Sequence, residues 1–463
     1  MRGAWSTLAL VAVALGLGAY IYFVDSKRPE TEAKEKVFAV EADAVEELRV
    51  TAKGDTSVLR KTDGSWKLVE PLATDADANE VSALVNSLSS LELNREVDPN
   101  AADLAEYGLA APKADITFTA KGGVTGRVRL GDQTPTASDI YALKGDDKRV
   151  FLVSTFVENS LARSSFELRD KRVLRFERDK VDGLEIAGTS ATTALARANS
   201  EWRLVAPSNA RGDYGAIEGL LTRLSTTMMS GIETTDLNTL PKFGLDKPTA
   251  TIAVKTGSST ATLALGTTVD GKTYARDLSR PMVFTVDATM ATDLQKGSDE
   301  YRKKEVFDFR AFSATGLVVV RGPDTITFKK ATGTGENPVD KWTITGPGSA
   351  ATRDADAAKI DDFLNQLSNL RAQSFVPAAP AAVSSPVLKA SAEFDENKKE
   401  EASFGRAGDD VFAARPDEAG AMRLEAAPFD GALKALDAVL APPAPATPPA
   451  TPPATAAPPE KKP

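Results

Sequence analysis

A tryptophan-centred phrase occurs three times in this chain of 463 residues. It reads WKLVEP at residues 66–71, WRLVAP at residues 202–207 and WTITGP at residues 342–347. The second tryptophan follows the first by 136 residues, and the third follows the second by 140. This spacing is much longer than the unit of a solenoid protein, and it gives each copy enough residues for its own hydrophobic core. The repeated phrase therefore predicts three tandem domains.

After each phrase the apolar residues change to the spacing of an amphipathic helix. The three apolar stripes are Val81, Leu84, Val85, Leu88 and Leu91; Ile217, Leu220, Leu221 and Leu224; and Ile360, Phe363, Leu364, Leu367 and Leu370. Asp75 or Asp77 stands where the first helix needs an amino-terminal cap. Because the tryptophan, the proline and the stripe recur together, we interpret each indole as a core side chain that buries about 200 Å² rather than as a ligand platform.

Alternating segments on both sides of the phrase predict strands. VEELRV at 45, VDGLEI at 181 and ATGLVV at 314 each open a strand, and Asp63-Gly64 is a hairpin signal. Further along, YGLAAP at 107 matches FGLDKP at 243, and RLGD at 129 matches ALGT at 264, with FGRA at 404 as a weaker third copy. We therefore expect an α+β fold class, with three tandem repeat domains of mostly antiparallel strands and one main amphipathic helix in each.

The repeats place the three domains at residues 37–176, 177–311 and 312–440. The third domain is degenerate, because SSPVLKA at 384 stands where the YGL element belongs, and we expect its fold to be the least regular. The junctions LRDKRVLRF at 168 and YRKKEVFDF at 301 admit two interpretations. Each is either a basic patch or a junction strand whose apolar residues are packed while its Lys and Arg stay solvated. We favour the junction strand.

Residues 1–36 are expected to form a membrane anchor and a linker. The run from Gly3 to Val24 has 22 residues without a charge, enough to cross a hydrocarbon core of about 30 Å. A cleaved signal peptide is the alternative, but the run is longer than an h-region and no small-x-small cleavage site follows it. Basic residues flank both ends, so charge alone leaves the orientation open. Small residues at 12–18 would permit weak self-association of two anchors.

Residues 441–463 predict an extended, disordered tail. They are rich in proline and alanine and show no apolar periodicity, so they suit neither a helix nor an interior strand. Such a tail either solubilises the chain or reaches a partner that offers a groove. We favour the solubilising role.

Cysteine and histidine are both absent from the chain. Their absence excludes disulfides, thiolate nucleophiles, Ser-His-Asp triads and zinc sites built from Cys or His. The net charge of -9 argues against broad attraction to nucleic acid. No phosphate-binding glycine motif occurs, so we expect no cofactor. Asp75-x-Asp77-x-Asn79 is similar to the start of a calcium loop, but Glu80 and Asn86 occupy the glycine and bidentate-acid positions, which favours helix capping and no metal.

The combination of motifs resembles a bacterial family, the domain of unknown function 4340 family. The matching segments are SWKLVEP, EYGLAAP, VRLGD, IYALKG and FELRDKRVLRF, with a second set from EWRLVAP to YRKKEVFDF. The resemblance covers residues 37–311 well and 312–440 loosely. It implies a single-pass protein of the inner membrane with most of its chain in the periplasm, often encoded beside an ABC transporter and an auxiliary subunit of the gliding-motility type. It implies no catalytic, cofactor-binding or metal-binding residue.

Three hypotheses about function follow from these observations. The leading hypothesis is a non-catalytic accessory or scaffold of an ABC-transporter-type envelope complex, because core residues recur while no reactive constellation does. The alternative is a cell-wall glycan hydrolase that uses two carboxylates, which needs no histidine. Among 65 Asp and Glu residues, however, the sequence singles out no pair. Passive binding of a glycan or peptide in clefts between the repeats is a further alternative.

Overall fold

The computed structural model describes most of the chain. The described residues are 35–188, 192–331, 340–346, 351–395 and 397–441, together with the isolated positions Val13, Gly16 and Tyr20. The predicted anchor, apart from those three positions, and the predicted tail after Ala441 lie outside this set. Within the described residues, no helix has the length and apolar character that a membrane crossing requires. The chain divides into two compact units, residues 1–171 and 172–463, which are described separately.

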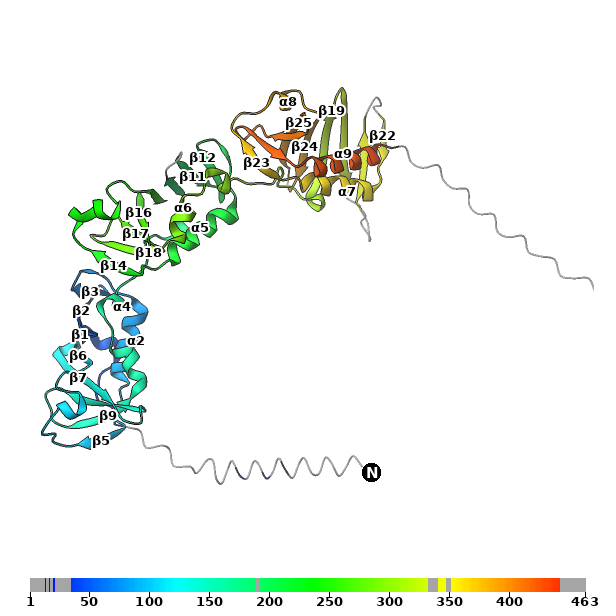
Figure 1. The fold of residues 1–463 in the computed structure, drawn as a ribbon. Helices are drawn as coiled ribbons and strands as arrows, with labels where there is room; N and C mark the ends of the chain where they lie inside the picture. The colour runs from blue at the N-terminus through cyan, green and yellow to red at the C-terminus, as the bar shows by residue number, and fades with distance from the viewer. Residues whose placement is uncertain are drawn as a thin grey trace, which may run out of the picture. The chain divides into compact units, whose positions relative to one another are not determined.

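Three antiparallel sheets of nine strands each form the framework of the described chain (Figure 1). The first sheet has the order β4-β3-β2-β1-β6-β7-β8-β9-β5, and the other two repeat this order with their own strands. The first lies in unit 1, and the second and third lie in unit 2. The structure therefore has a mostly β fold made of three repeats. The number of repeats and the antiparallel pairing agree with the predictions from the sequence, and a few helices accompany the sheets.

The strands of the first sheet are β1 (Val45–Ala52), β2 (Asp55–Thr62), β3 (Ser65–Glu70), β4 (Thr74–Asp75), β5 (Arg95–Asp98), β6 (Ala114–Ala120), β7 (Val124–Gln133), β8 (Asp139–Lys144) and β9 (Val150–Ser154). Those of the second are β10 (Gly183–Ala187), β11 (Thr193–Ala198), β12 (Glu201–Ala206), β13 (Ala210–Arg211), β14 (Gly231–Thr234), β15 (Ala250–Thr256), β16 (Ser259–Val269), β17 (Lys272–Asp277) and β18 (Val283–Asp287). Those of the third are β19 (Ala314–Arg321), β20 (Asp324–Ala331), β21 (Lys341–Thr345), β22 (Thr352–Asp354), β23 (Ala372–Val376), β24 (Leu388–Phe394), β25 (Lys398–Ala407), β26 (Asp410–Ala414) and β27 (Ala421–Leu424).

Helices connect and cover these strands. The longer ones are α2 (Ala78–Ser89), α5 (Tyr214–Thr226), α7 (Ala357–Ser368) and α9 (Ala426–Leu440). The short ones are α3 (Glu158–Leu161), α4 (Ser165–Leu168), α6 (Thr289–Leu294) and α8 (Ala381–Ser384). The 3-10 turns are η2 (Ala42–Ala44), η3 (Ala105–Tyr107), η4 (Lys121–Gly123), η5 (Thr155–Val157), η6 (Arg178–Lys180), η7 (Leu237–Phe243), η8 (Ser298–Tyr301) and η9 (Ala311–Ser313).

The main helix of each repeat forms where the apolar stripe predicted it. In α2 the buried residues are Val81, Leu84, Val85 and Leu88, which recur at helical spacing. Asp77 caps this helix, since its carboxylate accepts hydrogen bonds from the backbone N–H groups of Asn79 at 3.0 Å and Glu80 at 3.3 Å. Asp213 and Asp356 cap α5 and α7 in the same way. The prediction that Asp75 or Asp77 caps the first main helix is therefore confirmed for Asp77.

The three repeated tryptophans lie on equivalent strands but are not equally buried. Trp202 and Trp342 are each 3% exposed, as expected for core side chains. Trp66 is only half-buried, although it packs against the core of the first sheet. The core role is thus confirmed for the second and third indoles, and the first covers the edge of its core.

The YGL and FGL phrases form 3-10 segments that lie directly against a neighbouring strand. Gly108 ends η3 with φ of 67°, a left-handed conformation that favours glycine. A Cβ atom on Gly131 would lie 2.1 Å from the carbonyl oxygen of Tyr107, and one on Gly266 would lie 2.1 Å from that of Phe243. The glycine of each RLGD or ALGT motif is therefore required by close backbone approach.

This contact creates a second, smaller core in each of the first two repeats. In the first, Leu109, Leu143 and Val150 are buried together, and the rings of Tyr107 and Tyr141 meet edge-on at 5.1 Å. In the second, the rings of Phe243 and Tyr274 meet in the same way at 4.8 Å. The recurring motif is thus explained by packing.

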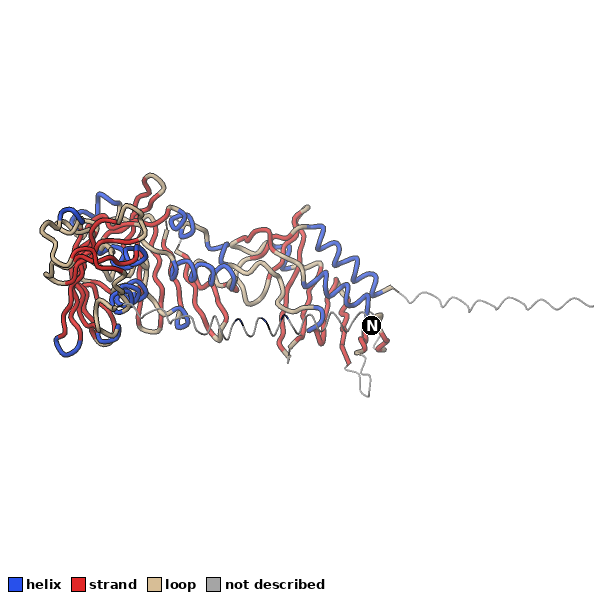
Figure 2. Tube along the Cα trace, turned by 90° about the horizontal axis from the view of Figure 1, so that it is seen from below, coloured by secondary structure: helices blue, strands red, loops and turns tan. Residues whose placement is uncertain are grey.

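The third repeat differs from the other two in its connections and not in its strand order. Helix α8 stands where the YGL segment belongs, and a Cβ atom on Gly405 would lie 2.1 Å from the carbonyl oxygen of Ala382. The degeneracy expected for this repeat therefore lies in its helices, and the expectation of one main helix is wrong for it. Helix α9 runs beside α7 along the third sheet (Figure 1), and the two helices again lie side by side in the view of Figure 2.

We expect Gly266→Ala to destabilise the second repeat by about 3 kcal/mol, because its new methyl group would meet a backbone carbonyl that no side-chain rotation can move aside. The matched control is Gly219→Ala in α5, where a Cβ atom meets nothing within 4 Å. That change should stabilise the helix by about 1 kcal/mol. Urea unfolding followed by circular dichroism measures both. Equal effects of the two substitutions would contradict this explanation of the motif.

Candidate functional site

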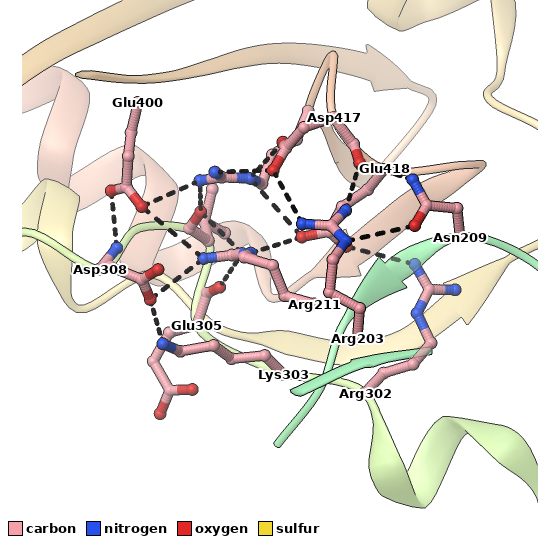
Figure 3. A network of polar contacts seen from close by, with 12 residues as sticks. Arg203, Asn209, Arg211, Arg302, Lys303, Glu305, Asp308, Glu400, Asp417 and Glu418 are labelled. Atoms are coloured by element: carbon pink, nitrogen blue, oxygen red, sulfur yellow. Dashed lines mark hydrogen bonds and ion pairs between the residues drawn. The ribbon is translucent and has the colours of Figure 1, made fainter. Parts of the chain in front are cut away.

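The most buried concentration of charge in the second unit lies where the second repeat passes into the third (Figure 3). We call it the junction network. Its side chains come from the β12–β13 edge, the junction segment and the third sheet, and they are Arg203, Asn209, Arg211, Arg302, Lys303, Glu305, Asp308, Glu400, Arg415, Asp417 and Glu418. This site was not predicted, because its members are scattered over the sequence.

Arg211 is the centre of the junction network. Its side chain is 9% exposed, and its Nε donates to Glu418 Oε1 at 2.5 Å. Its second terminal nitrogen donates to the backbone carbonyl of Glu305 at 2.6 Å, and its first lies 3.1 Å from Asp308 Oδ1. One guanidinium therefore joins the second repeat to the junction segment and to the third sheet at once.

Two carboxyl groups of the network differ in how they titrate. Burial raises the pKa of Glu400, and the charge of Asp308 adds to this rise. Burial also acts against ionisation of Asp308, but Arg211 and Lys303 outweigh it and hold the pKa of this carboxyl below its usual value. Diverging pKa values in a pair of acids are typical of general acid–base sites.

The surroundings of this pair nevertheless fit a structural role. Glu400 is 8% exposed, and its Oε2 accepts backbone N–H groups from Asp308 at 2.7 Å and Phe309 at 3.3 Å. Its Oε1 lies 3.6 Å from Arg415 and 3.9 Å from Arg211. A glycosidase needs two carboxyl groups on either side of a sugar that can reach them. Here both oxygens of Glu400 serve the protein itself.

A turn before the last strand of each repeat in the second unit holds the incoming segment. In the second repeat, Arg280 donates to the carbonyl oxygens of Arg172 at 2.8 Å and Val173 at 2.7 Å, and it pairs with Asp277 at 2.9 Å. In the third repeat the charges are exchanged. Arg415 stands in the place of Asp277 and donates to Val306 at 2.8 Å, while Glu418 stands in the place of Arg280.

The junction-strand interpretation is confirmed for its apolar residues. Val173, Val306, Phe307 and Phe309 are all fully buried. The expectation that the basic residues stay solvated is wrong for two arginines, because Arg169 and Arg302 are also buried. Arg302 reaches Glu418 at 3.6 Å and lies 4.0 Å from the ring centre of Phe375, which compensates its loss of hydration. Each of these turns contains an Arg-Pro dipeptide, at 280 and at 415, which the sequence reasoning overlooked.

Equivalent clefts occur inside the first and third repeats. Both lie beside the hairpin turn of the first two strands and a proline that precedes the central strand. The cleft of the first repeat, of about 700 Å³, is lined by Lys53, Gly54, Pro112, Lys113, Glu158, Asn159, Ala162, Arg163 and Glu167. That of the third, of about 670 Å³, is lined by Arg321, Gly322, Asp324, Ile326, Ser385, Pro386, Val387, Arg406 and Leu440. The volumes suit a small ligand.

The charged groups of the first cleft are engaged in the fold. Lys53 pairs with Glu167 at 2.7 Å, and Arg163 pairs with Glu80 at 3.0 Å. Glu167 also completes a capping box with Ser164 at the start of α4. Partial burial acts against its ionisation, but the hydrogen bonds from Lys53 and Ser164 outweigh this and lower the pKa of Glu167 to about 2. The cleft can accept a ligand, yet its charges chiefly stabilise the repeat.

The residues of the suggested calcium loop have structural partners. Asp77 caps α2, and Asp75 forms an ion pair with Lys67 across β3 and β4. Over the whole described part of the chain, no three His, Cys, Asp or Glu side chains are grouped so that they could hold a metal ion.

We expect Arg211→Ala to lower the free energy of unfolding of the second unit by about 3–5 kcal/mol, because Glu418 would remain buried without its main partner. The matched control is Arg203→Ala. Arg203 belongs to the same network but is more exposed, so its loss should cost less than about 1 kcal/mol. Differential scanning calorimetry distinguishes the two, and a mild effect of Arg211→Ala would contradict the central role of this residue.

The first repeat should lose stability in acid. The folded-state pKa of Glu167 lies below the ordinary value of 4.5, so the stabilisation is complete above pH 4.5 and disappears as the pH falls toward 2. In Glu167→Gln this part of the pH dependence should vanish. Urea unfolding of the wild type and of Glu167→Gln between pH 6 and about 2.5 tests whether the free energy of unfolding falls with pH as expected. Parallel stability curves for the two proteins would refute it.

Comparisons with known proteins identify the family. The family model described as Domain of unknown function (DUF4340) matches residues 66–201 and 202–389. No curated protein matches the chain. Among solved structures, the DNA polymerase sliding clamp from Pseudomonas aeruginosa with ligand is 8% identical, covers 85% of this chain and 93% of its own, and has a TM-score of 0.17. The DnaN sliding clamp from the same organism bound to griselimycin is 9% identical, with coverages of 85% and 94% and a TM-score of 0.15. Such scores carry no argument about fold or function.

The family match spans well over half of the sequence, and the chain therefore belongs to the domain of unknown function 4340 family.

Proposed function

We propose that this protein is a non-catalytic accessory or scaffold subunit of an ABC-transporter-type envelope complex. In this proposal residues 3–24 anchor it once in the inner membrane, and its three repeats lie in the periplasm. The main support is that recurring residues of the repeats build the fold. Tryptophans lie against the cores, motif glycines lie under backbone carbonyls and aspartates cap helices. A body of this kind offers surfaces for partners.

The junction network adds support from a second direction. Arg211 and Arg415 tie the junction segment to the third sheet through hydrogen bonds to backbone carbonyls and through buried ion pairs. Such contacts are directional, so they favour one arrangement of the second and third repeats over others. A scaffold needs its docking surfaces at fixed spacing. The transporter as partner comes from the family resemblance, in which an ABC transporter is often encoded beside these proteins.

Protease added to intact spheroplasts should digest the repeats of the full chain, because the proposal places them outside the inner membrane. A cytoplasmic protein in the same cells serves as the control for lysis. Protection of the repeats until the membrane is broken would reject the proposed orientation.

Transporter subunits should co-purify with the tagged full chain from detergent-solubilised membranes, and mass spectrometry identifies them. A variant with residues 3–24 replaced by an unrelated membrane segment should still recover them, because the repeats are proposed to make the contact. Recovery of the protein alone would contradict the scaffold proposal. Loss of the subunits in the variant only would move the contact to the anchor.

A further inference from the structure

Each sheet has an outer edge beside the main helix of its repeat, and the third repeat differs from the first two in whether a further segment pairs with this edge. In the first repeat, the chain that follows α4 returns to this edge. Asp77 N–H donates to the carbonyl oxygen of Leu168 at 2.9 Å, and Asp170 N–H donates to that of Asp75 at 3.0 Å. Ala76 thus faces Arg169 in an antiparallel bridge. An extended segment therefore closes the β4 edge.

The second repeat closes its β13 edge in the same register. Asp213 N–H donates to the carbonyl oxygen of Tyr301 at 2.8 Å, and Lys303 N–H donates to that of Arg211 at 2.9 Å. Gly212 faces Arg302 in the bridge. In both repeats a small residue on the edge faces a buried arginine of the added segment.

In the third repeat, no segment within the described part of the chain is added to the same edge. Ala355 N–H donates to the carbonyl oxygen of Trp342 at 2.9 Å, as the equivalent residues Ala76 and Gly212 do to Trp66 and Trp202. Among the residues that the structure describes, however, none pairs with the outward Asp356 N–H or with the outward carbonyl of Asp354. Both aspartates are exposed. Unpaired strand edges of this kind accept extended peptides.

The residues directly after α9 differ from those that complete the ladder in the first two repeats. Helix α9 continues to Leu440, and Arg353 on the edge donates to the carbonyl oxygens of Val439 at 3.3 Å and Leu440 at 3.4 Å. The next residues after Ala441 are Pro442 and Pro443. Proline has no N–H group, so it cannot supply the donor that Asp170 and Lys303 supply in the first two repeats.

We infer that the edge formed by Asp354, Ala355 and Asp356 is a docking site for an extended basic segment of a partner protein. Backbone pairing supplies the affinity, and the two exposed carboxylates favour a segment with Arg or Lys opposite Ala355, as Arg169 and Arg302 stand opposite the equivalent residues. The inference deepens the proposed scaffold function and rests on it for the statement that the partner is a protein.

A peptide with the sequence of residues 166–176, FELRDKRVLRF, is the probe, because this segment closes the equivalent edge of the first repeat. Fluorescence anisotropy with the full chain in detergent should show saturable binding with a Kd on the order of 10–100 μM. The same peptide methylated on the backbone nitrogen of its Asp170 should bind at least tenfold more weakly, since it lacks the N–H that the edge accepts. The absence of saturable binding, or equal binding of the two peptides, would overturn the inference.

Two substitutions locate the binding edge. Asp356 has φ of -70°, which proline also adopts, so Asp356→Pro removes the outward N–H without a change of conformation. Asp356→Ala loses the helix cap equally but keeps this N–H. The proline variant should bind the peptide at least tenfold more weakly than the alanine variant, and equal binding would place the peptide elsewhere and reject the site.

Sedimentation of the full chain distinguishes a partner protein from a second copy. The chain should sediment identically with and without the peptide. Self-association that the peptide disperses would assign the edge to a second copy and overturn the partner assignment. Failure of these measurements leaves the co-purification of transporter subunits as a separate result, because that experiment does not depend on the edge.

Discussion

An arginine that holds the carbonyl oxygens of an incoming strand is the contact on which the second unit depends. Arg280 holds those of Arg172 and Val173, and Arg415 holds that of Val306. These carbonyls belong to the segments that precede the first strand of each of these two repeats, and arginine N–H groups satisfy them in place of a sheet ladder. The acid and the arginine change places between the two turns, Asp277 and Arg280 in one and Arg415 and Glu418 in the other, so the ion pair beside the strand is kept while the positions of its two charges are not.

The junction network shows how much charge such a contact can bury when every member has a partner. Burying an isolated arginine would cost several kcal/mol, and pairing it with a carboxylate offsets that cost without adding much stability. The network instead favours one packing of the third repeat against the second, because its hydrogen bonds and ion pairs are directional. Arg211 meets Glu418, Asp308 and the carbonyl of Glu305 together, and a shifted packing of the third repeat would leave several of these groups unpaired.

The three repeats share one fold but differ in how their outer sheet edge is paired. Each copies the sheet order, the capped helix and the glycine beneath a backbone carbonyl. The first two repeats pair their outer edge with the chain that follows, whereas the equivalent edge of the third pairs with none of the residues that the structure describes. This difference supports the scaffold proposal, because an extended segment of another protein can pair with such an edge.

The sequence by itself determined the number of repeats, the main helices and their aspartate caps, because apolar periodicity and capping are properties of neighbouring residues. The sequence did not predict α9, because Pro428 and Gly431 interrupt its apolar stripe. Pro428 is nevertheless compatible with the helix, since proline in the first turn costs no hydrogen bond. Only the tertiary structure decided the partial exposure of Trp66, the burial of Arg169 and Arg302, and the junction network. Arg211 and Glu418 are 207 residues apart, and no local pattern connects charges that meet only after two sheets have formed.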